Sequence, residues 1–257
     1  MKGVLLAGGV GSRLKPLTNT VNKHILPVGR YPMIYHPLRT LYDSGINQVM
    51  IVTGKEHLGT VVSQLGSGST LGMDLTYKVQ DEADGIAGAL RLVKDFINNQ
   101  NFAMILGDNI FTNDIKKHLG NGFNFSNKNN EPVCKLFFQP MAKEKLTRFG
   151  VPEFDQDGSV KGIVEKPKVP PSKYCVTGLY VYDKNVWKIL DTIEKSKRAE
   201  FEISDVNSWY AKNGFIEFSI IGAQSDCWFD AGTPETLIDA NIKMSKVIYD
   251  GWRLKDI

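Results

Sequence analysis

Short apolar runs alternate with amphipathic stretches through the first 110 residues of the chain. Brief apolar runs that end in glycine or polar residues predict buried strands at Gly3–Ala7, Val49–Thr53, Asp74–Val79 and Phe102–Leu106. Helical spacing predicts helices at Met33–Asp43, Leu58–Leu65 and Ile86–Ile97. Strands and helices in this alternation are typical of a parallel sheet covered on both faces. The strands of such a sheet end along one edge, where its ligands bind.

After Asp108 the pattern changes, and strand-like runs predominate. They lie at Val133–Phe138, Gly150–Phe154, Val160–Val164, Tyr174–Tyr182 and Phe215–Ile220. Helices are expected at Asn185–Ile193, at Asp205–Lys212 and from Thr233 onward, and the polar stretch Gly120–Asn130 predicts a surface loop. No repeat or linker divides the chain. We therefore expect one α/β domain over residues 1–257, a Rossmann-like three-layer αβα unit with a mixed central sheet and a small β-rich lobe.

Composition narrows the possible classes of protein. Hydrophobic residues make up 42% and charged residues 23% of the chain, so we expect a folded protein rather than a disordered one. The net charge of +3 is too small to indicate nucleic-acid binding. Its three cysteines show no C-x-x-C spacing, and no apolar run suits a signal peptide or a membrane span. These features predict a cytoplasmic protein that binds neither nucleic acid nor a membrane.

The first predicted strand runs into the glycine-rich loop Gly8-Gly9-Val10-Gly11-Ser12-Arg13-Leu14. The dinucleotide fingerprint fits Gly9 and Gly11, but its third glycine falls on Leu14, and the acid that binds ribose is missing. The P-loop pattern also fails. What remains is a loop of small residues whose backbone amides can approach phosphates, with Arg13 beside it. A tight turn with surface cations is the alternative.

Two carboxylates follow apolar strands in the same manner. Asp108 comes directly after Phe102–Leu106 and Gly107, and Asp230 precedes a helix that Thr233 can cap. One or two carboxylates together with substrate phosphates are how Mg²⁺ is usually held. Turn-forming aspartates are the alternative for each. Lys23 and the pair Glu165-Lys166 are further candidates, although each on its own is consistent with a solvated surface charge.

With these residues in hand, the chain resembles the sugar-1-phosphate nucleotidylyltransferases, and within them the thymidylyltransferases that use glucose 1-phosphate. The resemblance runs in family order over nearly the whole chain. It is carried by Leu6–Leu14 with Pro16 and Thr18, Lys23 with Leu26–Val28, Pro32–Ile34, Gln80 with Gly85–Ala87, Leu106–Asn109, Phe149–Val151, Glu165–Pro167, Thr177–Tyr180 and Trp228–Thr233. It implies the nucleotide-diphospho-sugar transferase fold, with a nucleotide-binding part over about residues 1–110 and a sugar-binding part over about 111–257.

The resemblance also implies a reaction and a role for each matched residue. A nucleotidyl group would pass from dTTP to α-D-glucose 1-phosphate, giving dTDP-glucose and pyrophosphate, with Arg13, Lys23 and Asp108 as the catalytic residues. The nucleotide would contact Leu6, Gly8, Gly9, Gly11, Ser12, Arg13, Gln80 and Gly85. The sugar phosphate would contact Lys23, Asn109, Gly150, Glu165, Lys166 and Val176. Mg²⁺ would be the cofactor, bound by Asp108 and Asp230, and relatives of this kind commonly form homo-oligomers.

The chain departs from the family pattern at one position, and three alternative functions remain open. Thymidylyltransferases usually carry Gln directly after the lysine, where this chain has His24. Imidazole presents its donor and acceptor in a different geometry, so the same reaction with UTP or CTP is one alternative. A dehydrogenase that holds NAD on the first loop and a non-catalytic sensor of sugar nucleotides are the others. The chain ends soon after its last predicted helix, so we expect the short form, without the added C-terminal helices of an effector site.

Overall fold

A computed structural model describes residues 1–112, 115, 131–222 and 228–252 of the chain. The strands of the main sheet are β1 (Lys2–Ala7), β4 (Gln48–Gly54), β5 (Asp74–Gln80), β6 (Phe102–Leu106), β8 (Cys134–Pro140), β11 (Tyr174–Tyr182) and β12 (Ile216–Ile220). The short strands are β2 (Pro27–Val28), β3 (Tyr31–Pro32), β7 (Asn109–Phe111), β9 (Gly150–Phe154), β10 (Val160–Glu165) and β13 (Trp228–Asp230). The helices are α1 (Tyr35–Asp43), α2 (Leu58–Leu65), α3 (Ile86–Arg91), α4 (Lys94–Ile97), α6 (Lys143–Leu146), α7 (Val186–Leu190), α8 (Ile203–Lys212) and α9 (Pro234–Met244).

The main sheet has seven strands in the order β12-β8-β11-β6-β1-β4-β5. β1 pairs in parallel with β4 and β6, and β4 pairs in parallel with β5. β11 runs antiparallel to both β6 and β8, and β12 is parallel to β8. The sheet is therefore mixed, as the sequence predicts, and it takes strands from both halves of the chain.

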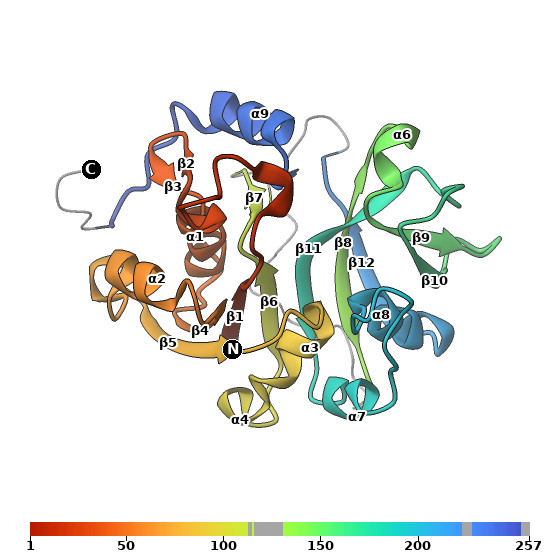
Figure 1. Cartoon of the computed structure of the whole chain (residues 1–257). Helices are drawn as coiled ribbons and strands as arrows, with labels where there is room; N and C mark the ends of the chain where they lie inside the picture. Colours follow the sequence, from red (N-terminus) through yellow and green to blue (C-terminus); the bar gives the residue numbers. More distant parts are fainter. Residues whose placement is uncertain (113–114, 116–130, 223–227, 253–257) are drawn as a thin grey trace.

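Helices cover both faces of this sheet (Figure 1). Alternate residues of β1 enter different cores: Leu5 and Ala7 join one, and Val4 and Leu6 join the other. The first core contains apolar residues of α1, α2 and α9, and the second contains those of α3, α4, α7 and α8. The predicted three-layer αβα arrangement is confirmed.

A small β-rich lobe lies beside the main sheet, as predicted, and packs against β11 and α8. β9 and β10 form an antiparallel pair near α6, away from the helices that flank β1 (Figure 1). A second short pair joins β7 to β13, with Asp230 opposite Asn109, and brings the end of the chain back to the end of β6. This return places the two predicted metal ligands at one edge of the sheet.

Two local predictions differ from the structure or lie outside it. The single helix expected at Ile86–Ile97 is two short helices, because Leu92 and Val93 interrupt it between α3 and α4. The predicted loop at Gly120–Asn130 lies outside the described residues. The last helix begins as predicted, with Pro234 at its first position and the Thr233 side chain accepting from Thr236 in a capping box.

Candidate active site

A cavity of about 590 Å³ lies over the edge of the sheet where β1, β5 and β6 end. The sequence-predicted residues that line it are Leu6, Gly8, Gly9, Ser12, Arg13, Lys23, Gln80, Gly85, Asp108, Asn109, Gly150, Glu165, Lys166, Val176 and Asp230. These residues come from positions 6 to 230 of the chain, and the fold brings them to one hollow. Gly11 is not among the lining residues.

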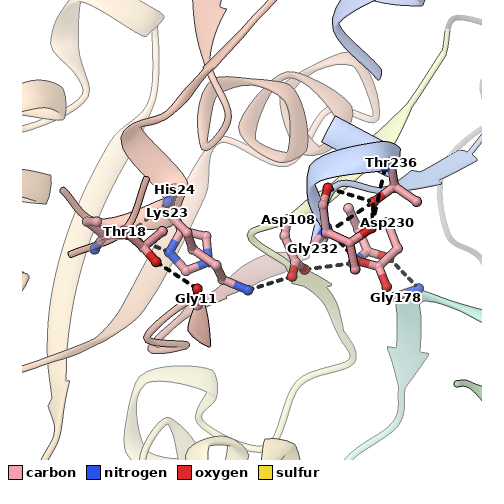
Figure 2. Close-up of polar contacts among 12 residues, drawn as sticks. Gly11, Thr18, Lys23, His24, Asp108, Gly178, Asp230, Gly232 and Thr236 are labelled. Atoms are coloured by element: carbon pink, nitrogen blue, oxygen red, sulfur yellow. Dashed lines mark hydrogen bonds and ion pairs between the residues drawn. The ribbon is translucent and has the colours of Figure 1, made fainter. Parts of the chain in front are cut away.

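The glycine loop makes room for Lys23. Gly11 has a left-handed backbone (φ 69°), and its carbonyl accepts from the Thr18 hydroxyl at 2.7 Å (Figure 2). A Cβ on Gly11 would lie 2.9 Å from the Lys23 Cβ, and one on Gly9 would lie 3.1 Å from the Lys23 Nζ. The loop glycines therefore allow close approach of the Lys23 side chain.

Lys23 and Asp108 form an ion pair inside the cavity. The Lys23 Nζ lies 2.5 Å from the Asp108 Oδ2, and each side chain is 12% exposed (Figure 2). Burial on its own would raise the pKa of Asp108, but the charge and hydrogen bond of Lys23 outweigh it and hold that pKa below its usual value. The Asp108 side chain is therefore an ionised carboxylate at neutral pH.

Asp230 lies across the strand pair from Asp108. The amide of Ala231 donates to the Asp108 carbonyl at 2.9 Å, and the amide of Gly232 donates to the Asp230 Oδ1 at 2.9 Å. Burial first, and then repulsion from the Asp108 carboxylate, raise the pKa of Asp230, although Arg13, Lys23 and Arg148 oppose the shift. Neighbouring buried carboxylates that repel each other suit a divalent cation.

The two aspartates thus fit the donor set of a hard metal ion. Mg²⁺ is commonly bound by one or two carboxylates together with substrate phosphates. Within the described part of the chain, no group of three or more His, Cys, Asp or Glu side chains is placed to hold a metal. A metal at Asp108 and Asp230 would therefore take further ligands from water or substrate.

His24 lies in the cavity wall as a buried, neutral imidazole that is 1% exposed. The Asn22 Oδ1 accepts from the His24 backbone amide at 2.8 Å and lies 2.9 Å from its Nδ1. Since the oxygen faces His24, Nδ1 carries the proton and Nε2 keeps a free lone pair. Burial, followed by the charge of Lys23, lowers the pKa of His24 to about 3.

A charged cluster also lines the cavity, at the end of β10. The Ser204 hydroxyl donates to the Glu165 Oε2 at 2.5 Å, and the Lys166 Nζ lies 3.2 Å from the Glu165 Oε1. Arg198 pairs with Glu202 at 2.7 Å and with Glu165 at 3.5 Å. This part of the cavity therefore offers both cations and hydrogen-bonding carboxylates.

Several lining residues were not predicted from the sequence, notably Arg148, Arg198, Glu202, Tyr180 and Trp228. The dense charge of Lys195–Glu202 is a signal for Arg198 and Glu202, whereas Arg148 stands among ordinary surface charges. The alternation of Tyr180 and Tyr182 along a strand predicts that Tyr180 is a packing residue. It does stack on Tyr182, with ring centroids 6.0 Å apart, but it also reaches the cavity.

Comparison with known proteins identifies the family of the chain. The nucleotidyl transferase family model matches residues 2–247. A glucose-1-phosphate thymidylyltransferase of Mycolicibacterium smegmatis is 39% identical, over 94% of this chain and 81% of the relative. One from Neisseria gonorrhoeae is 38% identical, over 93% and 81%.

Solved structures with a similar fold point to the same family. A Bacillus anthracis protein with the provisional name glucose-1-phosphate thymidylyltransferase, in complex with sucrose, is 45% identical with a TM-score of 0.86, and the match covers 97% of each chain. UDP-glucose pyrophosphorylase bound to UDP-glucose shares the fold, with a TM-score of 0.77 at 23% identity. Among the described residues, no helix is long and apolar enough to cross a membrane. The chain belongs to the nucleotidyl transferase family and is a nucleotidyltransferase enzyme.

Proposed function

We propose that this enzyme transfers a thymidylyl group from dTTP to α-D-glucose 1-phosphate, forming dTDP-glucose and pyrophosphate. The observation that carries the proposal is the gathering of Arg13, Lys23, Asp108 and Asp230 around one cavity with Glu165 and Lys166. Relatives named glucose-1-phosphate thymidylyltransferase, at 36–39% identity, support dTTP and glucose 1-phosphate as the substrates.

The chemical obstacle is the approach of one anion to another. A phosphate oxygen of the sugar attacks the α-phosphorus in line with the leaving pyrophosphate, and that oxygen is already ionised at neutral pH. Two unit charges 4 Å apart repel by about 4 kcal/mol at an effective dielectric constant near 20. Arg13 would offset this repulsion at the triphosphate, Lys23 between the α-phosphate and the sugar phosphate, and Lys166 at the sugar phosphate. Alignment of the two bound substrates supplies a further large share of the rate enhancement.

Members of this family generally use a divalent metal ion, and we propose Mg²⁺ here. Asp108 and Asp230 would hold it. When bound, the ion would neutralise charge on the phosphates and orient them. Protein side chains keep the two carboxylates able to bind the ion: Lys23 keeps Asp108 ionised, and Arg13 and Arg148 oppose the rise in the pKa of Asp230.

The lining residues would divide between the two substrates as the family resemblance implies. Leu6, Gln80 and Gly85 would contact the nucleotide, and the Gln80 Nε2 donates to the Asp84 Oδ1 at 2.9 Å. The sugar would lie near Gly150, Glu165 and Val176. Arg198, which the sequence did not predict, would join Lys166 at the sugar phosphate.

A nucleotide panel tests this proposal. The purified chain is given glucose 1-phosphate, Mg²⁺ and each of dTTP, UTP, CTP, ATP and GTP, and pyrophosphate release is measured. We expect the highest kcat/KM with dTTP. A preference for UTP or CTP would support the alternative that His24 suggested, which the names of the relatives do not favour. Lack of turnover with every triphosphate would contradict the proposal. Assembly into a homo-oligomer is a separate prediction, to be checked by sedimentation.

A further inference from the structure

Trp228 has a buried polar contact that the proposed substrate contacts do not explain. It opens β13 two residues before Asp230 and is 3% exposed. Its indole Nε1 donates to the Asn109 Oδ1 at 2.5 Å, and its ring meets the edge of Phe149 with centroids 5.5 Å apart. An indole N–H can only donate, so this contact constrains the atom that it meets.

The orientation of the Asn109 amide follows from its neighbours. The Oδ1 accepts a second hydrogen bond, from the Gly178 backbone amide at 2.9 Å. Both neighbours can only donate, so the oxygen must face them and the amide nitrogen must point away. The Nδ2 then donates to the Asp108 Oδ1 at 2.9 Å. Trp228 and Gly178 thus determine that the nitrogen of the Asn109 amide, and not its oxygen, faces Asp108.

The Asp108 carboxylate is consequently held at both oxygens. Asn109 donates to Oδ1, and Lys23 donates to Oδ2. The close approach of Gly178 supports the same arrangement independently, because a Cβ there would lie 2.3 Å from the Asn109 Oδ1. The strand β11 leaves no room for a side chain on Gly178 while the amide is in this position. In Figure 2, Asp108 and Gly178 lie on either side of the side chain that bridges them.

We propose that Trp228 is a positioning residue that acts through Asn109. Its indole N–H fixes the orientation of the Asn109 amide. The amide in turn fixes the rotation of the Asp108 carboxylate, and this rotation is the one that the reaction requires. Asn109 is then committed to Asp108 through its nitrogen and to two donors through its oxygen, rather than to the hexose alone. The expected kinetic effects rest on the proposed function, whereas the orientation of the Asn109 amide rests on the hydrogen bonds alone.

A double-mutant cycle tests the relay. Trp228→Phe keeps an aromatic ring and removes the donor, and we expect kcat to fall about tenfold with the KM for glucose 1-phosphate changed less than about twofold. In an Asn109→Ala background, the same replacement should cost no more than about twofold further. Losses that multiply would overturn the proposal, because Trp228 would then act independently of Asn109.

Trp187 offers a matched control. It is 4% exposed and stacks on Phe102 at 5.4 Å, and its indole nitrogen has no hydrogen-bond partner among the described residues. Trp187→Phe is therefore the same chemical change without the relay, and kcat should stay at the wild-type value. A tenfold loss in this variant would overturn the proposal by showing that loss of any buried indole lowers kcat.

An NMR measurement tests the contact without turnover. In the ¹⁵N-labelled full chain, the Trp228 indole signal is identified by its loss in Trp228→Phe. Asn109→Ala should move it upfield, and Asn109→Asp should leave it near its wild-type position while lowering kcat, because Asp keeps the acceptor but loses the donor to Asp108. A Trp228 signal unmoved by Asn109→Ala, or full activity in Asn109→Asp, would overturn the proposal. A wild-type chain that folds but does not turn over would refute the proposed function instead, and the NMR result would still stand.

Discussion

Replacing His24 by Gln, the residue that similar enzymes usually carry, should change how the stability of the fold depends on pH. The unfolded chain takes up a proton on this imidazole near pH 6.5, whereas in the folded chain the pKa is about 3. Between these values the unfolded state binds more protons, so lowering the pH destabilises the fold. From pH 7 to pH 5 the loss due to His24 is about 2 kcal/mol, at 1.36 kcal/mol per pH unit.

Urea denaturation at pH 7 and pH 5 measures this effect. The free energy of unfolding of His24→Gln should fall by about 2 kcal/mol less than that of the wild type over this interval. His36 is a useful parallel, because burial lowers its pKa to about 4, so His36→Gln should remove a loss of similar size. Equal pH dependence in wild type and His24→Gln would refute the buried, neutral imidazole.

Three further predictions concern the site itself. Asp108→Asn should abolish metal-dependent turnover, with circular dichroism unchanged; activity near wild type would refute the metal assignment. Arg13→Ala should lower kcat by about 10²-fold or more, because its contacts strengthen in the transition state; a change in KM alone would restrict it to binding. Gly178→Ala should lower kcat because the added methyl displaces Asn109, whereas Gly162→Ala, where a Cβ meets nothing within 4 Å, should not; equal rates in the two would contradict the crowding.

Much of the fold follows from local pattern. The apolar runs of β1, β4 and β6 are short and bounded by glycine or polar residues, and the fully buried strands of a covered sheet require such runs. The strand-rich second half predicted a mixed sheet. The sequence could not give the strand order, because the insertion of β11 between β6 and β8 depends on tertiary pairing. The break between α3 and α4 is also tertiary, since Leu92 and Val93 have no helix-stopping chemistry.

The residues of the candidate site likewise fall into those that the sequence located and those that it did not. Gly8, Gly9, Asp108 and Asp230 stand at strand ends, where the carboxyl edge of a sheet gathers ligands, so local pattern with the family resemblance located them. Arg198 could not be found in that way, and Trp228, although it opens the matched stretch Trp228–Thr233, was assigned no role. Arg198 reaches the cavity from an irregular segment before α8, and the role proposed for Trp228 depends on an amide 119 residues away.

The account requires direct transfer between two bound polyanions, held by cations and carboxylates, without a covalent protein intermediate. The stereochemical course at the α-phosphorus tests this requirement most directly, using dTTP made chiral by sulfur at that position. A single in-line displacement predicts inversion of configuration in the dTDP-glucose product. Retention would require two displacements through a nucleotidyl-enzyme, and would contradict the account.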